Sequence, residues 1–228
     1  MKRQDLVFAL VVIIVFLPFI LFPEVYAWYK AFNAGHGIIM SFIKFAVLST
    51  MGEMLGLRIS TGVYNYQGFG LFPRMVVWGV LGVIINFAMI LFSTGTPVVL
   101  EYIGLDNATA LMSLPLSWSK VLVAFSVSVA MNSFFGPVFM TFHKISDTHI
   151  LQCGGSWRSL VTPIPMSSII TTLNWNVQWN FVFKKTIPLF WFPAHTVTFL
   201  LPPEARVLCA ALLGVALGVI LAVSARKR

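Results

Sequence analysis

The sequence is poor in charged residues, and this scarcity indicates the solvent in which the chain folds. Only 10% of its 228 residues are Asp, Glu, Lys or Arg, whereas 58% are hydrophobic. A soluble domain carries about 25% charged residues. So little charge cannot cover a globular surface in water, so the long apolar runs are predicted to be membrane spans. We expect an all-α integral membrane protein with one domain, residues 1–228.

Catalytic and cofactor motifs are also missing. The sequence contains no His-Glu-x-x-His, Gly-x-Ser-x-Gly, Walker or Gly-x-Gly-x-x-Gly pattern. Its 4 histidines are widely spread, and its 2 cysteines, Cys153 and Cys209, are interpreted as free thiols in a loop and a span. We therefore expect a protein that is not an enzyme and has no cofactor or metal.

A formal net charge of +8 is common among nucleic-acid-binding proteins, but the positions of the basic residues argue against that class. The basic residues stand at the chain ends and beside the apolar runs: Lys2, Arg3, Arg74, Lys120, Lys184, Lys185, Arg226, Lys227 and Arg228. This distribution is typical of integral membrane proteins, whose cytoplasmic segments are rich in Lys and Arg. The expected partner is the lipid bilayer, with no nucleic acid.

Hydrophobic runs predict about six spans, at residues 6–22, 37–57, 75–92, 121–142, 187–201 and 207–223. The first, within residues 1–27, is interpreted as an uncleaved span. The loop at 93–119 holds Glu101 and Asp106 without Lys or Arg and is expected outside, whereas both basic termini are expected in the cytoplasm. The expected location is the bacterial inner membrane.

Residues 167–185 mix aromatic side chains, such as Trp175 and Trp179, with asparagines. That mixture suits an additional helix lying in the membrane interface. An aromatic belt before the fifth span explains the same residues equally well.

Two predicted spans have small or short polar residues at every fourth position. Ala210, Gly214, Gly218 and Ala222 form one stripe, and Ala124, Ser128, Asn132 and Gly136 form the other. Small faces allow helix backbones to approach closely in lipid. We therefore expect a compact bundle, in which the 210–222 stripe contacts another helix, and association with a second copy is an open alternative.

Polar residues inside the predicted spans are the candidate functional residues. His195 and Thr198 lie on one side of the fifth span, and Asn86 and Asn132 lie inside the third and fourth. We predict that these four line a polar central cleft; the alternative is that each bonds a neighbouring backbone carbonyl. Glu53 and Arg206 are predicted to pair, because a paired charge is cheaper to bury than a lone one.

The C-terminal third carries a recognisable pattern. It reads Trp191-Phe192-Pro193, then Thr198-Phe199, then Leu201-Pro202 and Arg206. With Trp28-Tyr29 and Met51-Gly52-Glu53 upstream, residues 28–225 resemble the Mpv-seventeen/PMP-twenty-two type family of small peroxisomal and mitochondrial inner-membrane proteins. Trp191, Pro193, Phe199, Pro202 and Arg206 match its C-terminal motif. The resemblance implies a helical membrane bundle with channel-like behaviour.

Part of this pattern also has a local physical reason. Pro193 suits the first turn of a helix, and Pro202 with Pro203 should end that helix and start the next. We predict a small channel or transporter for small solutes. The alternative is a structural or assembly subunit without transport activity.

Overall fold

The computed structural model describes residues 3–226, with side chains up to residue 223, and the described chain is helical without strands. Residues 1–2 and 227–228 lie outside the described residues, and with them the basic Lys2, Lys227 and Arg228, on which part of the predicted orientation depends. The first half of the chain forms α1 (Arg3–Leu21), α2 (Pro23–Gly35), α3 (Gly37–Thr61), α4 (Leu71–Tyr102) and α5 (Ala108–Leu111). The second half forms α6 (Trp118–Gln152), η1 (Trp157–Leu160), α7 (Met166–Thr172), α8 (Trp175–Val177), η2 (Gln178–Trp191), α9 (Phe192–Leu200) and α10 (Pro203–Arg226).

Five of the described helices are long and apolar enough to cross a membrane: α1, α3, α4, α6 and α10. They coincide with five of the predicted spans. Helices α4 and α6 have 32 and 35 residues, so they are about 48 Å and 52 Å long and exceed a hydrocarbon layer of about 30 Å. The chain is therefore a helical membrane protein whose two longest helices extend beyond the apolar layer.

The segment predicted as the fifth span belongs to a longer helical stretch, residues 175–200. This stretch comprises α8, the π-helix η2 and α9, which follow one another without a break. Residues 167–185 consequently do not form one separate helix, since α7 ends at Thr172 and the next helical stretch begins at Trp175.

Prolines shape this stretch and its connection to α10. Pro188 lies inside η2, and Pro193 is near the start of α9 although no loop precedes it. Because proline lacks an N–H group, the turns at these two positions each lose a backbone hydrogen bond. Leu201 is extended, with ψ of 156°, and Pro203 begins α10, so the predicted stop and restart are confirmed.

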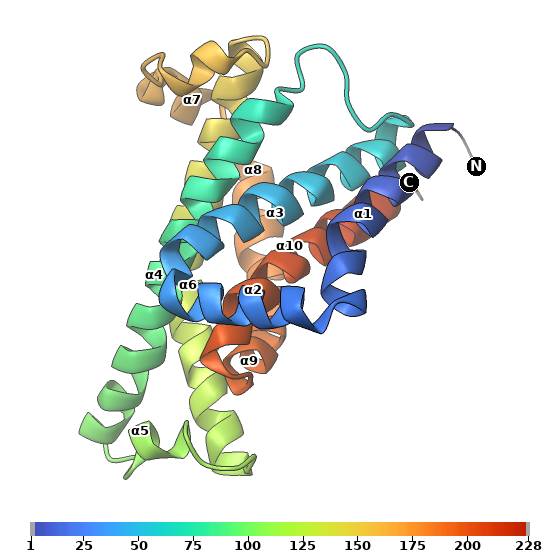
Figure 1. The fold of residues 1–228 in the computed structure, drawn as a ribbon. Helices are drawn as coiled ribbons and strands as arrows, with labels where there is room; N and C mark the ends of the chain where they lie inside the picture. Colours follow the sequence, from blue (N-terminus) through green and yellow to red (C-terminus); the bar gives the residue numbers. More distant parts are fainter. Residues whose placement is uncertain (1–2, 227–228) are drawn as a thin grey trace.

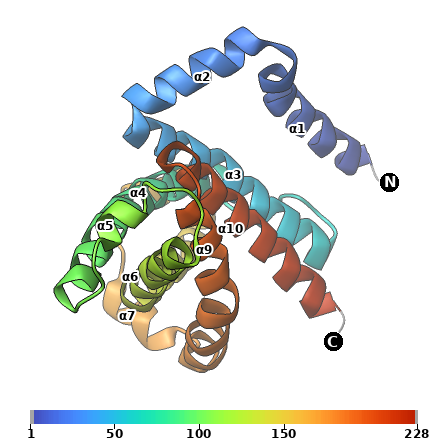
Figure 2. The same ribbon diagram turned by 90° about the horizontal axis from the view of Figure 1, so that it is seen from below.

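Among the long helices, α3 packs against both α4 and α10, and α4 also packs against α6. Figure 1 shows α4 and α6 running side by side, with α3 and α10 crossing them at an angle. Helix α9 packs against α6, and α1 and α2 lie on the outside of the bundle (Figure 2).

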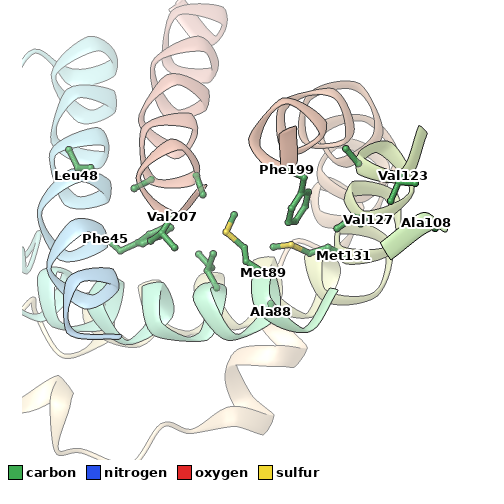
Figure 3. Close-up of a cluster of buried hydrophobic side chains, with 14 residues drawn as sticks. Phe45, Leu48, Ala88, Met89, Ala108, Val123, Val127, Met131, Phe199 and Val207 are labelled. Carbon is green, nitrogen blue, oxygen red and sulfur yellow. The ribbon is translucent and has the colours of Figure 1, made fainter. Parts of the chain in front are cut away.

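The apolar core lies where α3, α4, α6, α9 and α10 meet (Figure 3). Its buried members include Phe45, Met89, Val127 and Phe199, with 3%, 3%, 0% and 0% of their surface exposed. Two helices touch closely at Gly82 of α4, where an added Cβ would lie 2.4 Å from the Cβ of Phe45. The core therefore depends on the absence of a side chain at that glycine.

The stripe on α10 behaves as predicted at two of its members. Ala210 is buried, and a Cβ added to Gly218 would lie 3.6 Å from the carbonyl oxygen of Gly52 on α3. At Gly214, however, a Cβ would have no described atom of another residue within 4 Å, beyond its chain neighbours and the backbone of its own helix turn. The expectation of helix contact is wrong at this position, because Gly214 faces a cavity instead.

Candidate functional site

A cavity of about 290 Å³ occupies the middle of the bundle. Its walls come from α3, α4, α6, the end of η2, α9 and α10. Most of the wall is apolar and includes Phe45, Met131, Phe135, Phe139, Leu217 and Leu221. Gly52, Gly136, Gly214 and Gly218 also line it, and the missing side chain of Gly214, where an added Cβ would meet no other residue within 4 Å, provides part of its volume.

One part of the wall contains the predicted pair Asn132 and His195. The amide of Asn132 lies 3.0–3.1 Å from Nδ1 of His195, and its nitrogen donates a 2.8 Å hydrogen bond to the carbonyl oxygen of Ser128. The Ser128 hydroxyl donates in turn to the carbonyl oxygen of Phe192, at 2.8 Å. Asn132 therefore fixes the His195 ring across the α6–α9 contact.

Three buried polar atoms on cavity-lining residues have no hydrogen-bond partner among the described residues. They are the hydroxyl oxygen of Ser49, Nε1 of Trp191 and Nε2 of His195. The rings of Trp191 and His195 are neighbours, with centroids 4.9 Å apart. An unpaired buried polar group costs about 1–3 kcal/mol. All three belong to residues of the cavity wall, and each atom lies just behind the wall surface, with less than 1 Å² accessible.

Another part of the wall contains the carboxylate of Glu53. Its Oε1 accepts a 2.9 Å hydrogen bond from the Trp78 indole and lies 3.3 Å from Nε2 of His143. Its Oε2 accepts a 2.6 Å hydrogen bond from Arg74. Since both oxygens are engaged, Glu53 is neutralised where it lines the cavity.

Arg74 joins this carboxylate to a second one behind the cavity wall. Its guanidinium also forms an ion pair with Asp147 and donates through Nε to the carbonyl oxygen of Phe69, at 2.7 Å. The side chain is 7% exposed, and Lys144 completes the group with Nζ 3.5 Å from Asp147. The charge cluster, comprising Glu53, Arg74, His143, Lys144 and Asp147, thus ties α3, α4 and α6 together.

Of the four residues predicted to form the polar cleft, two come together and both line the cavity. These are Asn132 and His195. Thr198 is fully buried, donates to the carbonyl oxygen of Ala194 and lies 3.3 Å from Sγ of Cys209. Asn86 is half-buried and is not part of the described cavity wall. Thr198 and Asn132 each donate to a carbonyl oxygen of their own helix, which agrees with the alternative interpretation stated for these residues.

The predicted Glu53–Arg206 pair is wrong. Glu53 binds Arg74, whereas Arg206 donates to the carbonyl oxygens of Leu201 and Phe199 at the end of α9. Arg206 therefore satisfies carbonyl groups that lack partners at a helix end. The prediction matched the two residues because their charges are opposite, but it had no information on where their helices lie.

The remaining motif residues lie at the junction of η2, α9 and α10. Trp191 and Phe199 are buried, and the guanidinium of Arg206 lies 5.7 Å from the centroid of the Phe199 ring. Sequence analysis missed Trp78, His143 and Asp147. The available signal was helical spacing, because Arg74 and Trp78, and likewise His143 and Asp147, are four residues apart and share a helix face.

No protein family, curated protein or solved structure matches this chain. Within residues 3–226, no group of three or more His, Cys, Asp or Glu side chains is placed to hold a metal ion. The cavity and its polar atoms are therefore the observations from which a function is argued.

Proposed function

We propose that the protein is a channel or transporter for small solutes and that the central cavity is the place where the solute binds. The observation that supports the proposal is the cavity itself, because it is enclosed by most of the long helices and carries unpaired polar atoms. A hydrogen-bonding group inside an apolar bundle lowers the barrier that hydrocarbon presents to a solute. The resemblance to the Mpv-seventeen/PMP-twenty-two type family supports the same proposal.

The proposal includes six membrane crossings. Residues 175–200 would add the sixth to the five long helices. As an ideal α-helix these 26 residues would extend about 39 Å, and the 14 residues of the wider π-helix η2 shorten that length toward the roughly 30 Å that a span needs. Six crossings would bring both ends of the chain to the same side, which we propose to be the cytoplasm of a bacterial inner membrane.

Flux into liposomes tests the function. Purified protein would be reconstituted and the entry of inorganic ions and of small uncharged metabolites measured. Gly214→Leu should place its side chain in the cavity and abolish the flux that the wild type supports. Gly95→Leu is the matched control, because Gly95 also has no other described residue within 4 Å of an added Cβ but lies outside the cavity wall.

Two results would contradict the proposal. The first is wild-type liposomes that admit no tested solute faster than protein-free liposomes. The second is unchanged flux in Gly214→Leu at equal protein insertion.

The alternative proposal is an assembly subunit, and α1 is the observation in its favour. None of the described side chains of α1 is buried, although the helix is strongly apolar. Crosslinking in native membranes distinguishes the two functions. An assembly subunit should crosslink through α1 to a partner, and removing that contact should change the complex without changing flux.

A further inference from the structure

The chemistry of the cavity wall indicates the charge of the solute. No Lys or Arg is among the described residues that line it, and the one carboxylate there, Glu53, already holds Arg74, Trp78 and His143. An anionic ligand would find no free cation, and a cationic ligand would compete with Arg74. An unpaired charge in such a site carries a large desolvation cost. The cavity therefore suits an uncharged molecule.

The route into the cavity indicates that the ligand is soluble in lipid. Leu221 of α10 lines the cavity and is 37% exposed, so the cavity reaches the molecular surface near that residue. Helix α10 packs on α3 and α9, whereas α6 packs on α4 and α9, and the two contribute facing parts of the wall. An opening between two membrane-span helices faces lipid, so a ligand dissolved in the bilayer can reach it directly.

The unpaired polar atoms indicate the functional group. Trp191 Nε1 can only donate, the Ser49 hydroxyl can donate or accept, and His195 Nε2 does one or the other depending on its tautomer. A hydroxyl or carbonyl oxygen accepts from the indole, and a hydroxyl also donates to the imidazole. The three atoms are closed to solvent, so the ligand group must displace neighbouring apolar atoms slightly to reach them.

We propose that the cavity binds an uncharged, lipid-soluble molecule with an apolar body and one hydroxyl or carbonyl group, which enters from the bilayer between α6 and α10. This inference rests on the proposed function, because it assigns a substrate class to the same cavity. The polar group lies at Ser49, Trp191 and His195, and the apolar body lies along the phenylalanines and leucines of the wall.

Binding of three ten-carbon probes tests the substrate class. Radiolabelled decanol, decane and decanoate would be bound to the full chain in lipid nanodiscs, with empty nanodiscs subtracted. Decanol should bind saturably, and decanoate about tenfold or more weakly at neutral pH, because it brings an unpaired charge. Decane should bind more weakly than decanol, since it leaves the polar atoms unpaired.

Variants locate the probe. Trp191→Phe should weaken decanol binding about fivefold to tenfold and leave decane binding unchanged, because it removes one donor at nearly constant volume. Trp118→Phe, at a residue that is 89% exposed, is the control. Ser49→Ala tests the same polar group if Trp191→Phe fails to fold. Gly214→Leu should reduce binding of all three probes, and Gly95→Leu should not.

The outcomes separate this inference from the proposed function. If decanoate binds as tightly as decanol, the inference that the ligand is uncharged is wrong. If Trp191→Phe and Ser49→Ala both bind decanol with wild-type affinity, the assignment of the ligand's polar group to these residues is wrong. If decanol does not bind but Gly214→Leu still abolishes flux in liposomes, the substrate class fails and the transport proposal survives. If decanol binds but no solute crosses the liposome membrane, the ligand site is supported and the transport proposal is contradicted.

Discussion

Arg74 shows how a single residue can hold a membrane bundle together. It is a buried cation between two carboxylates on different helices, and its Nε satisfies a backbone carbonyl as well. Its guanidinium also lies 4.5 Å from the centroid of the Phe69 ring. Removing one member of such a group leaves the others without their counter-charge, and the loss exceeds the value of any one contact.

Arg74→Met should therefore lower the free energy of unfolding by about 3 kcal/mol, because two partly buried carboxylates lose their cation. Arg58→Met is the matched control. Arg58 pairs with Asp5 at 2.7 Å, but both side chains are about one fifth exposed, at 19% and 21%. The thermal unfolding midpoint in detergent measures both variants. A decrease for Arg74→Met no larger than that for Arg58→Met would contradict the role assigned to Arg74.

The sequence identified Glu53 as a residue that needs a partner but indicated the wrong arginine. Arg74 was assigned to the loop because the apolar run begins at Met75, whereas α4 begins at Leu71 and brings Arg74 into its first turn. The meeting of Asn132 and His195 was predicted correctly because both lie deep inside apolar runs. Hydropathy locates residues in the middle of helices better than residues at their ends.

At the scale of elements, the α3–α4 contact depends on glycine. Gly82 has no room for a side chain, because Phe45 Cβ would be 2.4 Å away, and the neighbouring Gly79 meets the Phe42 ring at the same distance. Backbone approach of this kind is the usual source of helix association in lipid.

Gly82→Ala should thus push the two helices apart and reduce stability by about 1–3 kcal/mol. Gly95→Ala on the same helix meets nothing within 4 Å, and should be neutral or stabilise by up to about 1 kcal/mol through higher helix propensity. The yield of folded protein in detergent and the thermal unfolding midpoint should be measured for both variants. Equal effects of both substitutions would show that the close contact does not limit α3–α4 packing.

Apolar runs predicted the existence of the five long helices but not their lengths. Helix α6 begins at Trp118 and continues to Gln152, well beyond the apolar run at 121–142, because polar residues can extend a helix outside the hydrocarbon. The π-helix η2 was not predicted, since over 14 residues the apolar spacing of its wider, i→i+5 bonded turns is hard to tell from that of an α-helix. The cavity could not be predicted either, because it depends on which faces of α6 and α10 are turned toward each other.

At the scale of the whole molecule, the proposed six-crossing arrangement would determine which loops share a compartment. A reporter fused at residue 110, beside α5, and one fused at the C-terminus should report opposite compartments, because α6, residues 175–200 and α10 lie between them. The C-terminal reporter should be cytoplasmic. Reporters on the same side would mean that residues 175–200 do not cross, leaving the five long helices as the only spans.

The exposed position of α1 has a consequence for biosynthesis. Its described polar anchors, the Asp5–Arg58 ion pair and the bond from Tyr64 to Asp5, join it to residues more than 50 positions later. At about 5–20 residues per second, Arg58 is synthesised roughly 3–10 s after Asp5. During that interval the only described helix that contacts α1 and is already synthesised is α2, and the strongly apolar composition of α1 makes it a helix that lipid can solvate on its remaining sides.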